Sequence, residues 1–109
     1  MTFKEIEQTA HASLMPTYAR FPVAIASGRG AVVTDVDGRE YIDFGSGIGV
    51  NSLGYGDPGW VAAVQAQAAA LPHISNLYYN ETSVSFARDL CAAAGMARAF
   101  LANSGAEAN

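Results

Sequence analysis

The segment Ala99–Asn109 restricts the possible folds more than any other part of this 109-residue chain. It begins with a short apolar run, Ala99–Ala102, which is typical of a strand covered on both faces, as in a sheet flanked by helices. Ser104 is a preferred helix N-cap residue, and Glu107 completes the S-x-x-E capping box, in which each side chain bonds the other's backbone amide. The sequence therefore predicts a strand, a turn and the start of a helix.

The start of that helix is a candidate anion site. The first-turn amides that a capping box leaves free point outward with the positive end of the helix dipole, which suits a phosphate ester. Gly105 would let such an anion approach the backbone closely. Because capping boxes are common, Ser104 and Glu107 by themselves favour simple helix capping over phosphate binding. Features elsewhere in the chain are needed to distinguish helix capping from phosphate binding.

Large apolar side chains are few for a chain of this length. Hydrophobic residues make up 50% of the sequence, but 21 of them are alanine. Stripes of alanine suit close packing of helices against other elements, and the chain stops where the last strand and helix would need such neighbours. We therefore expect an amino-terminal piece of a larger protein.

Charge and composition exclude several classes of function. The net charge is −4 with no basic run, which argues against nucleic acid and anionic membranes as partners and favours small-molecule chemistry. No apolar window approaches the length of a membrane span, and acidic residues stand where a signal peptide would be basic, so we expect a cytoplasmic protein. Cys91 has no second cysteine to pair with, and together with His11 and His73 it gives no metal-ligand spacing.

The region before residue 57 predicts a small sheet and a loop. The runs 31–35 and 39–44 are rich in β-forming residues, and Asp37-Gly38 between them is a hairpin-turn signal. Segment Gly28–Gly30 is interpreted as a break in the chain before the first strand. Segment 45–56 has five glycines in twelve residues, which frees its backbone to turn sharply and to lie close to another backbone or a ligand.

Three helices are predicted from their periodicity and end signals. The first runs from about residue 3 to 14, the second begins at Asp57-Pro58 and ends before Pro72, and the third begins after Asn80 and ends at Gly95. Apolar residues at helical spacing on the second and third helices are predicted to be buried. They are Trp60, Val61, Val64, Ala68, Leu71, Val84, Ala87, Leu90, Cys91 and Ala94.

Taken in order, four segments resemble the amino-terminal part of class III pyridoxal-phosphate aminotransferases. They are Tyr18–Pro22, Gly28–Phe44, Gly47–Gly54 and Asn103–Asn109. The resemblance implies an α/β fold, the amino-terminal portion of the fold-type I (aspartate aminotransferase-like) PLP transferase fold, which would be incomplete here. Residues 1–80 would form an amino-terminal segment and the start of the small domain, and residues 81–109 the start of the large cofactor domain.

The resemblance also implies roles for individual residues. In the family, a turn like Ser104-Gly105-Ala106 holds the phosphate of pyridoxal phosphate through backbone amides. Gly47 and Ile48 match a loop that approaches the substrate, where a glycine would leave room for an acyl group, although Gly47 could simply permit a turn. Tyr18 matches a tyrosine near the substrate carboxylate, but packing is the commoner role for such a residue.

The implied activity is the transfer of an amino group from N-acetylornithine to 2-oxoglutarate, a step in arginine biosynthesis, by a homodimer. Ornithine, 4-aminobutyrate and succinylornithine are alternative donors, and a non-catalytic anion-binding or interaction module is the alternative outside the family. Transamination requires a lysine, and Lys4, the chain's only lysine, lies far before the family's lysine. The chain therefore offers no candidate catalytic residue, and we expect it to be inactive alone.

Overall fold

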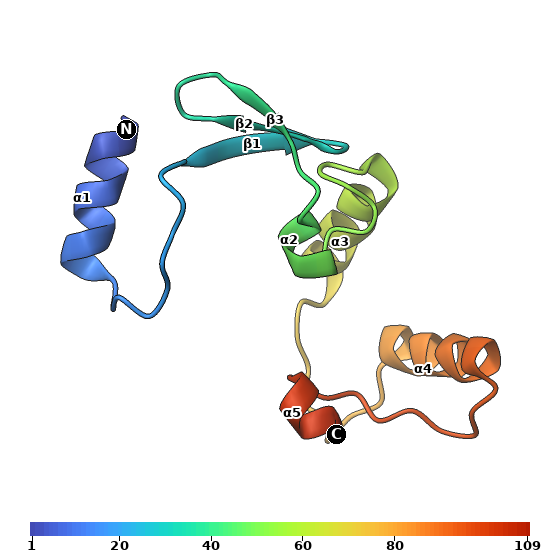
Figure 1. Ribbon diagram of the computed structural model, residues 1–109. Coiled ribbons are helices and arrows are strands. Elements are labelled where there is room, and N and C mark those ends of the chain that lie inside the picture. Colours follow the sequence, from blue (N-terminus) through green and yellow to red (C-terminus); the bar gives the residue numbers. More distant parts are fainter. The chain divides into compact units, whose positions relative to one another are not determined.

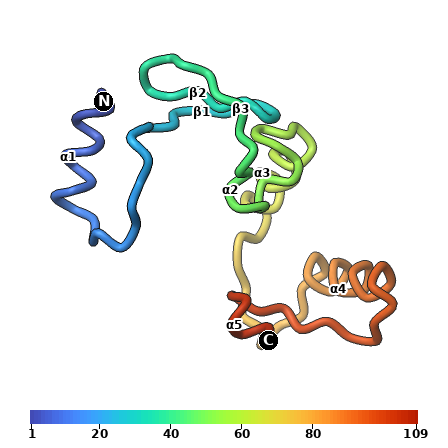
Figure 2. Tube along the Cα trace, in the orientation of Figure 1, coloured from blue at the N-terminus to red at the C-terminus, as the bar shows by residue number.

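The computed structural model describes residues 1–109 (Figure 1), which divide into two units, residues 1–68 and residues 69–109. Figure 2 traces the order of the elements along the chain. In that order they are α1 (Phe3–Ser13), β1 (Ile25–Arg29), β2 (Val32–Asp35), β3 (Glu40–Ile42), α2 (Ser46–Gly49), α3 (Pro58–Ala70), α4 (Glu81–Ala94) and α5 (Gly105–Ala108). None of the helices has the length and apolar character that a membrane span requires.

Helix α1 confirms the predicted amino-terminal helix and shows how it begins. Thr2 Oγ1 accepts a hydrogen bond from the amide of Glu5 at 3.3 Å, and the Thr2 amide donates to Glu5 Oε2 at 2.8 Å. This is a complete capping box, so both side chains satisfy amides that the first helical turn leaves unpaired. The helix ends at Ser13, before Pro16.

The sheet is antiparallel, in the order β1-β2-β3. The predicted hairpin is confirmed as β2 and β3, and Gly38 at its turn has φ +82°, a conformation that favours glycine. The Asp35 carboxylate is buried and accepts hydrogen bonds from the amides of Asp37 and Arg39 and from the hydroxyl of Tyr41. A single aspartate therefore holds the whole turn.

Strand β1 is not predicted by the sequence, because the glycines at 28 and 30 are typical of a break in the chain. In the structure, Gly28 pairs with Val33 and Arg29 pairs with Val32. A glycine inside a strand often marks a place where another group approaches the backbone closely. That is the case here, since the ring of Tyr55 lies against Gly28.

The ends of the two long helices confirm the predicted signals. Asp57 Oδ1 accepts from the Trp60 amide at 2.8 Å and begins α3. Asn80 Oδ1 accepts from the Ser83 amide at 3.0 Å and begins α4, which ends at Gly95 in the left-handed conformation with φ +66°. Local side chains therefore set the helix limits.

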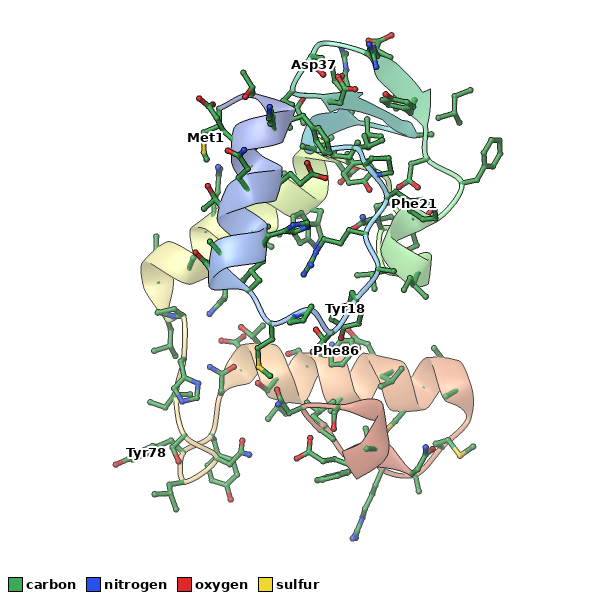
Figure 3. The ribbon with its side chains drawn as sticks, turned by 60° about the vertical axis from the view of Figure 1, so that its left-hand side comes forward. Met1, Tyr18, Phe21, Asp37, Tyr78 and Phe86 are labelled. Atoms are coloured by element: carbon green, nitrogen blue, oxygen red, sulfur yellow. The ribbon has the colours of Figure 1, made fainter.

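The predicted burial of the helix stripes is wrong for this chain. Val33, in the sheet, is the one hydrophobic residue that is buried. Large side chains such as Tyr78 and Phe86 are exposed (Figure 3). Trp60 on α3 and Val84 on α4 are 58% and 57% exposed. Within these 109 residues, the stripes have no element to pack against.

The predicted strand at Ala99–Ala102 is also absent. These residues belong to no helix or strand, and Phe100 is 77% exposed. A strand needs a neighbour to pair with its amides and carbonyls, and no other strand lies in residues 69–109. The apolar run is present, but the partner that would make it a strand is not.

Candidate functional site

Ser104 is the N-cap of helix α5, as the sequence predicted, but the capping box is only half formed. Ser104 Oγ accepts from the Glu107 amide at 3.4 Å and donates to Glu107 Oε2 at 2.8 Å. The Glu107 carboxylate thus bonds the hydroxyl of Ser104, and not its amide as the capping-box spacing predicted. The Glu107 carboxylate is therefore held at the side chain of the N-cap residue, Ser104.

The first amides of α5 are suited to a phosphate. The carbonyl oxygen of Ser104 accepts from the amides of Glu107 and Ala108, both at 3.2 Å, whereas the amides of Gly105 and Ala106 have no hydrogen-bond partner. Apart from Gly105 itself, its two chain neighbours and the backbone of α5, no atom lies within 4 Å of the position that a Cβ on Gly105 would occupy. Two free donors beside open space fit a phosphate ester.

The glycine-rich loop contains an unusual turn. Four consecutive residues, Ser46 to Gly49, have positive φ angles of 47°, 61°, 62° and 80°. Element α2 is therefore a left-handed turn, closed by hydrogen bonds from the Ile48 amide to the Gly45 carbonyl at 2.8 Å and from the Asn51 amide to the Ser46 carbonyl at 2.9 Å. Glycine accepts this conformation readily, whereas serine and the β-branched isoleucine do not.

Asp43 connects this turn to the rest of the unit. Its Oδ1 accepts from the amides of Gly45 at 2.8 Å and Ser46 at 3.0 Å, and its Oδ2 accepts from the hydroxyl of Tyr55 at 2.7 Å. The Tyr55 hydroxyl and then the two amides lower the pKa of Asp43, and the bond to Asp43 raises the pKa of Tyr55. Both shifts stabilise the form in which the aspartate is charged and the tyrosine is neutral.

Tyr55 is itself held against the sheet. Its amide donates to the carbonyl of Gly30 at 2.8 Å, and the amide of Gly30 donates to the carbonyl of Tyr55 at 2.9 Å. Gly28 and Gly54 allow this approach, because a Cβ on Gly28 would lie 2.5 Å from Tyr55 Cγ and one on Gly54 would lie 2.8 Å from the Gly30 oxygen. The backbone of the loop thus pairs with Gly30, the residue that follows β1.

Gly47 and Tyr18, both predicted to contact substrate, line different cavities. Gly47 lines one of about 640 Å³, together with Arg20, Asp43 and Tyr55. Tyr18 lines another of about 200 Å³ beside α1. Ile48 is fully exposed and lines neither. Ser104, Gly105 and Ala106 belong to the other unit, residues 69–109.

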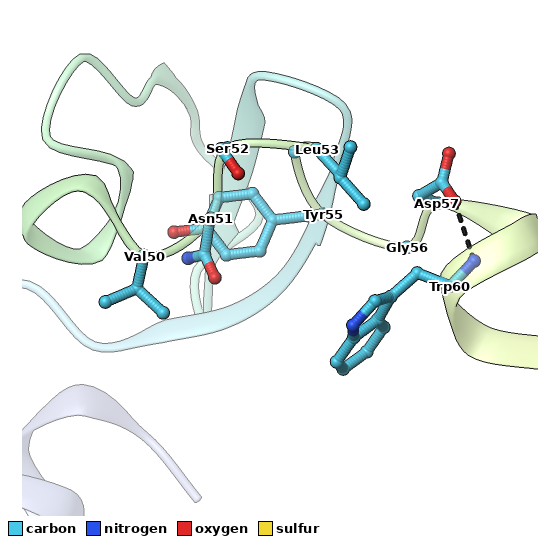
Figure 4. A pocket seen from close by; sticks show the side chains of 9 residues that line it. Val50, Asn51, Ser52, Leu53, Tyr55, Gly56, Asp57 and Trp60 are labelled. Atoms are coloured by element: carbon cyan, nitrogen blue, oxygen red, sulfur yellow. Dashed lines mark hydrogen bonds between the residues drawn. The ribbon is translucent and has the colours of Figure 1, made fainter. Parts of the chain in front are cut away.

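A third cavity, of about 320 Å³, lies between the glycine-rich loop and the start of α3 (Figure 4). Tyr55 lines it from the loop, and Trp60 lines it from the helix. Gly47 lines the cavity of about 640 Å³ and does not line this one.

Sequence reasoning did not identify Asp43 and Tyr55. An aspartate two residues before a glycine in a turn commonly accepts a hydrogen bond from the amide of that glycine, and this signal could have indicated Asp43. No local signal could have indicated Tyr55, because it lies twelve residues from Asp43.

Comparison with known proteins assigns the family. The profile described as "Aminotransferase class-III" matches residues 14–109. The chain belongs to the class-III aminotransferase family. A curated relative, the acetylornithine aminotransferase of Haemophilus ducreyi, is 50% identical over 109 residues, which is 100% of this chain and 28% of the relative.

Solved structures of aminotransferases have the same fold over this region. The acetylornithine aminotransferase of Elizabethkingia anophelis matches with a TM-score of 0.95 at 28% identity, over 99% of this chain and 28% of that chain. The ornithine aminotransferase of Toxoplasma gondii matches with a TM-score of 0.94 at 32% identity, over 99% of this chain and 25% of that chain. This class-III chain therefore has part of the α/β fold of PLP aminotransferases.

The chain spans about a quarter of the length of the curated relatives it matches. The class-III family and its structural relatives imply pyridoxal phosphate as the cofactor. The free amides of Gly105 and Ala106 fit the phosphate end of that group.

Proposed function

We propose that the full-length protein transfers an amino group from N-acetylornithine to 2-oxoglutarate, as a step in arginine biosynthesis. The observation that carries this proposal is the 50% identity, over all 109 residues, to a protein named acetylornithine aminotransferase. The proposal includes a cytoplasmic homodimer in which residues 1–80 begin the small domain and residues 81–109 begin the large domain.

In this proposal, the amides of Gly105 and Ala106 hold the cofactor phosphate, with Ser104 as its neighbour. When bound, pyridoxal phosphate supplies the electron sink that amino transfer needs. The chain's own contribution is to fix one end of the group by two hydrogen bonds and by the positive end of α5. Lys4 is exposed on α1 and has no part in the proposed reaction.

Gly47 is proposed to set the size of the donor that the site accepts. It lines the cavity of about 640 Å³ without a side chain, which leaves room for the acyl group of N-acetylornithine. A Cβ at this position would lie 3.1 Å from the side-chain nitrogen Nδ2 of Asn51, and the φ of +61° disfavours any side chain, so even alanine would strain the turn. Ile48 and Tyr18 are proposed as further substrate contacts.

The activity is tested on the full-length protein with pyridoxal phosphate and 2-oxoglutarate. We expect an absorbance band from bound cofactor and faster turnover of N-acetylornithine than of ornithine, 4-aminobutyrate or succinylornithine. Preference for one of these other donors would assign a different class-III activity. Absence of both the band and turnover would contradict aminotransferase function and support a non-catalytic module.

The phosphate site is tested by Gly105→Ala and a matched control, Gly59→Ala. Both glycines lie in the first turn of a helix, but only Gly105 is proposed to touch the phosphate. We expect Gly105→Ala to weaken cofactor binding, measured by equilibrium titration, while the stability of the cofactor-free protein does not fall. Equal cofactor affinity in the two variants would contradict the assignment.

A further inference from the structure

We infer that Asp43 and Tyr55 form a positioning pair that holds the left-handed turn Ser46–Gly49 in place beside the donor cavity. The inference rests on the proposed function in one respect, namely that Gly47 faces the amino donor. Neither residue is proposed to touch the substrate.

The turn needs an external restraint. Ser46 and Ile48 both have positive φ, at 47° and 62°, which is unfavourable for a residue with a side chain and most of all for a β-branched one. The side chain of Ile48 is fully exposed, so its packing within this chain does not hold the backbone there. Such a conformation persists only where surrounding contacts determine it.

Asp43 provides that restraint at the first half of the turn. Its Oδ1 accepts from the amides of both Gly45 and Ser46, which fixes the direction in which the chain enters the turn. A carboxylate bonded through one oxygen can still rotate, but the Tyr55 hydroxyl holds the second oxygen at 2.7 Å. The two oxygens together set the plane of the carboxylate, and hence the positions of the two amides.

Tyr55 can act in this way because contacts with Gly28 and Gly30 hold it in place. Its backbone pairs with Gly30 in both directions, and its ring lies against Gly28 in β1. The restraint therefore runs from the sheet through Tyr55 and Asp43 to the turn, and Gly47, Asp43 and Tyr55 all line the same cavity. Release of the turn would change the shape of that cavity at Gly47.

The test uses the full-length protein and the variant Tyr55→Phe, which removes only the hydroxyl and keeps the ring against Gly28. In the absence of substrate, we expect amide hydrogen exchange in segment 44–50 to accelerate by at least about threefold, because the bonds from Gly45 and Ser46 to Asp43 are loosened. With N-acetylornithine as donor, we expect KM to rise by a larger factor than kcat falls.

Tyr41→Phe is the matched control. It removes a hydroxyl-to-aspartate hydrogen bond of 2.8 Å, to Asp35 at the other turn of the same sheet. We expect exchange to accelerate near residues 36–39 in this variant and to stay unchanged in segment 44–50. A general weakening of the sheet would instead accelerate exchange in segment 44–50 in both variants, which would overturn the inference.

Unchanged exchange in segment 44–50 of Tyr55→Phe would also overturn it, whatever the activity. Faster exchange with an unchanged KM would show that the pair holds the turn but does not position it for the donor, and this too refutes the inference. Neither result bears on aminotransferase activity itself, which the turnover of the unmodified protein tests separately.

Discussion

Gly28 lies in β1 at a point where the ring of Tyr55 leaves no room for a side chain. A Cβ on Gly28 would lie 2.5 Å from Tyr55 Cγ, 2.8 Å from Tyr55 Cβ and 2.9 Å from Tyr55 Cδ1. Tyr55 cannot move away freely, because its backbone pairs with Gly30 and its hydroxyl with Asp43. We therefore predict that Gly28→Ala destabilises the junction between the sheet and the glycine-rich loop.

Two opposing contributions set the size of this effect. The φ angle of Gly28 is not positive, so alanine fits the backbone there and should gain about 0.4–1 kcal/mol by restricting the unfolded chain. Forcing an extra methyl group against a fixed ring costs about 1–3 kcal/mol. The difference between the midpoints of these two ranges is a loss of about 1.3 kcal/mol in the free energy of unfolding, and the largest loss that the ranges allow is about 2.6 kcal/mol.

Gly59→Ala separates these contributions, because it makes the same chemical change without the clash. Gly59 lies in α3 with a φ that is not positive, and its Cβ would approach Asp57 Oδ1 no closer than 3.4 Å. Alanine is favoured over glycine inside a helix by about 0.5–1 kcal/mol, so this variant should be stabilised. The same substitution thus has opposite signs at the two positions.

The assay is urea unfolding of the full-length protein, combined with amide hydrogen exchange at Gly30 and Tyr55. In Gly28→Ala, we expect a lower unfolding midpoint and faster exchange of these two amides, which pair with each other's carbonyls. If Gly28→Ala matched or exceeded the stability of the unmodified protein, with both amides still protected, the steric reasoning would be refuted.

Three other outcomes can be measured on the same protein. Ile48→Gly should raise the unfolding midpoint, since relief of the left-handed conformation gains about 1–2 kcal/mol and the flexibility of glycine offsets about 0.5–1 kcal/mol. An unchanged or lower midpoint would show that the backbone of Ile48 is not strained. Asn80→Ala should cost about 1 kcal/mol by removing the cap of α4, and Asn80→Asp, which keeps the accepting oxygen, should retain most of the stability. The hydrogen bonds of Asp43 should contribute fully to the free energy of unfolding above its ordinary pKa of 3.8, and this contribution should be lost as the pH falls through its lower folded-state pKa. The hydrogen bond from Tyr55 should be lost at the other end of the pH range, as the pH rises through a folded-state pKa above 10.0. A plot of thermal midpoint against pH should therefore be flatter at the acid end for Asp43→Asn than for the unmodified protein.

The end signals of the helices and the turn of the hairpin were predictable from sequence. Asp57, Asn80 and Ser104 each accept a hydrogen bond from an amide three residues later, and Gly38 and Gly95 adopt the positive φ that their turns require. Each of these contacts closes within a few residues. The sequence pattern and the physical contact therefore coincide.

The candidate site was predictable only in part. Gly47 and the turn Ser104–Ala106 were identified through the resemblance to a family, and their roles stay predictions. The pair Asp43–Tyr55 and the strand β1 were missed, because each depends on a partner that no local pattern names. Tyr55 contacts Gly28 and Gly30, which precede the hairpin in the sequence, whereas Tyr55 follows it.

The starts and stops of the elements follow from local residue patterns, since capping and positive-φ glycines act over one turn of chain. Which apolar runs become strands, and which loops are held by hydrogen bonds, depends on contacts that form only in the folded chain. Segment Ala99–Ala102 has the composition of a strand but no neighbour with which to pair, whereas Gly28 lacks strand character and becomes part of β1 because Val33 lies opposite it. The physical reason is that ladder hydrogen bonds and the Asp43–Tyr55 contact join residues distant in sequence, and they exist only once the fold brings those residues together.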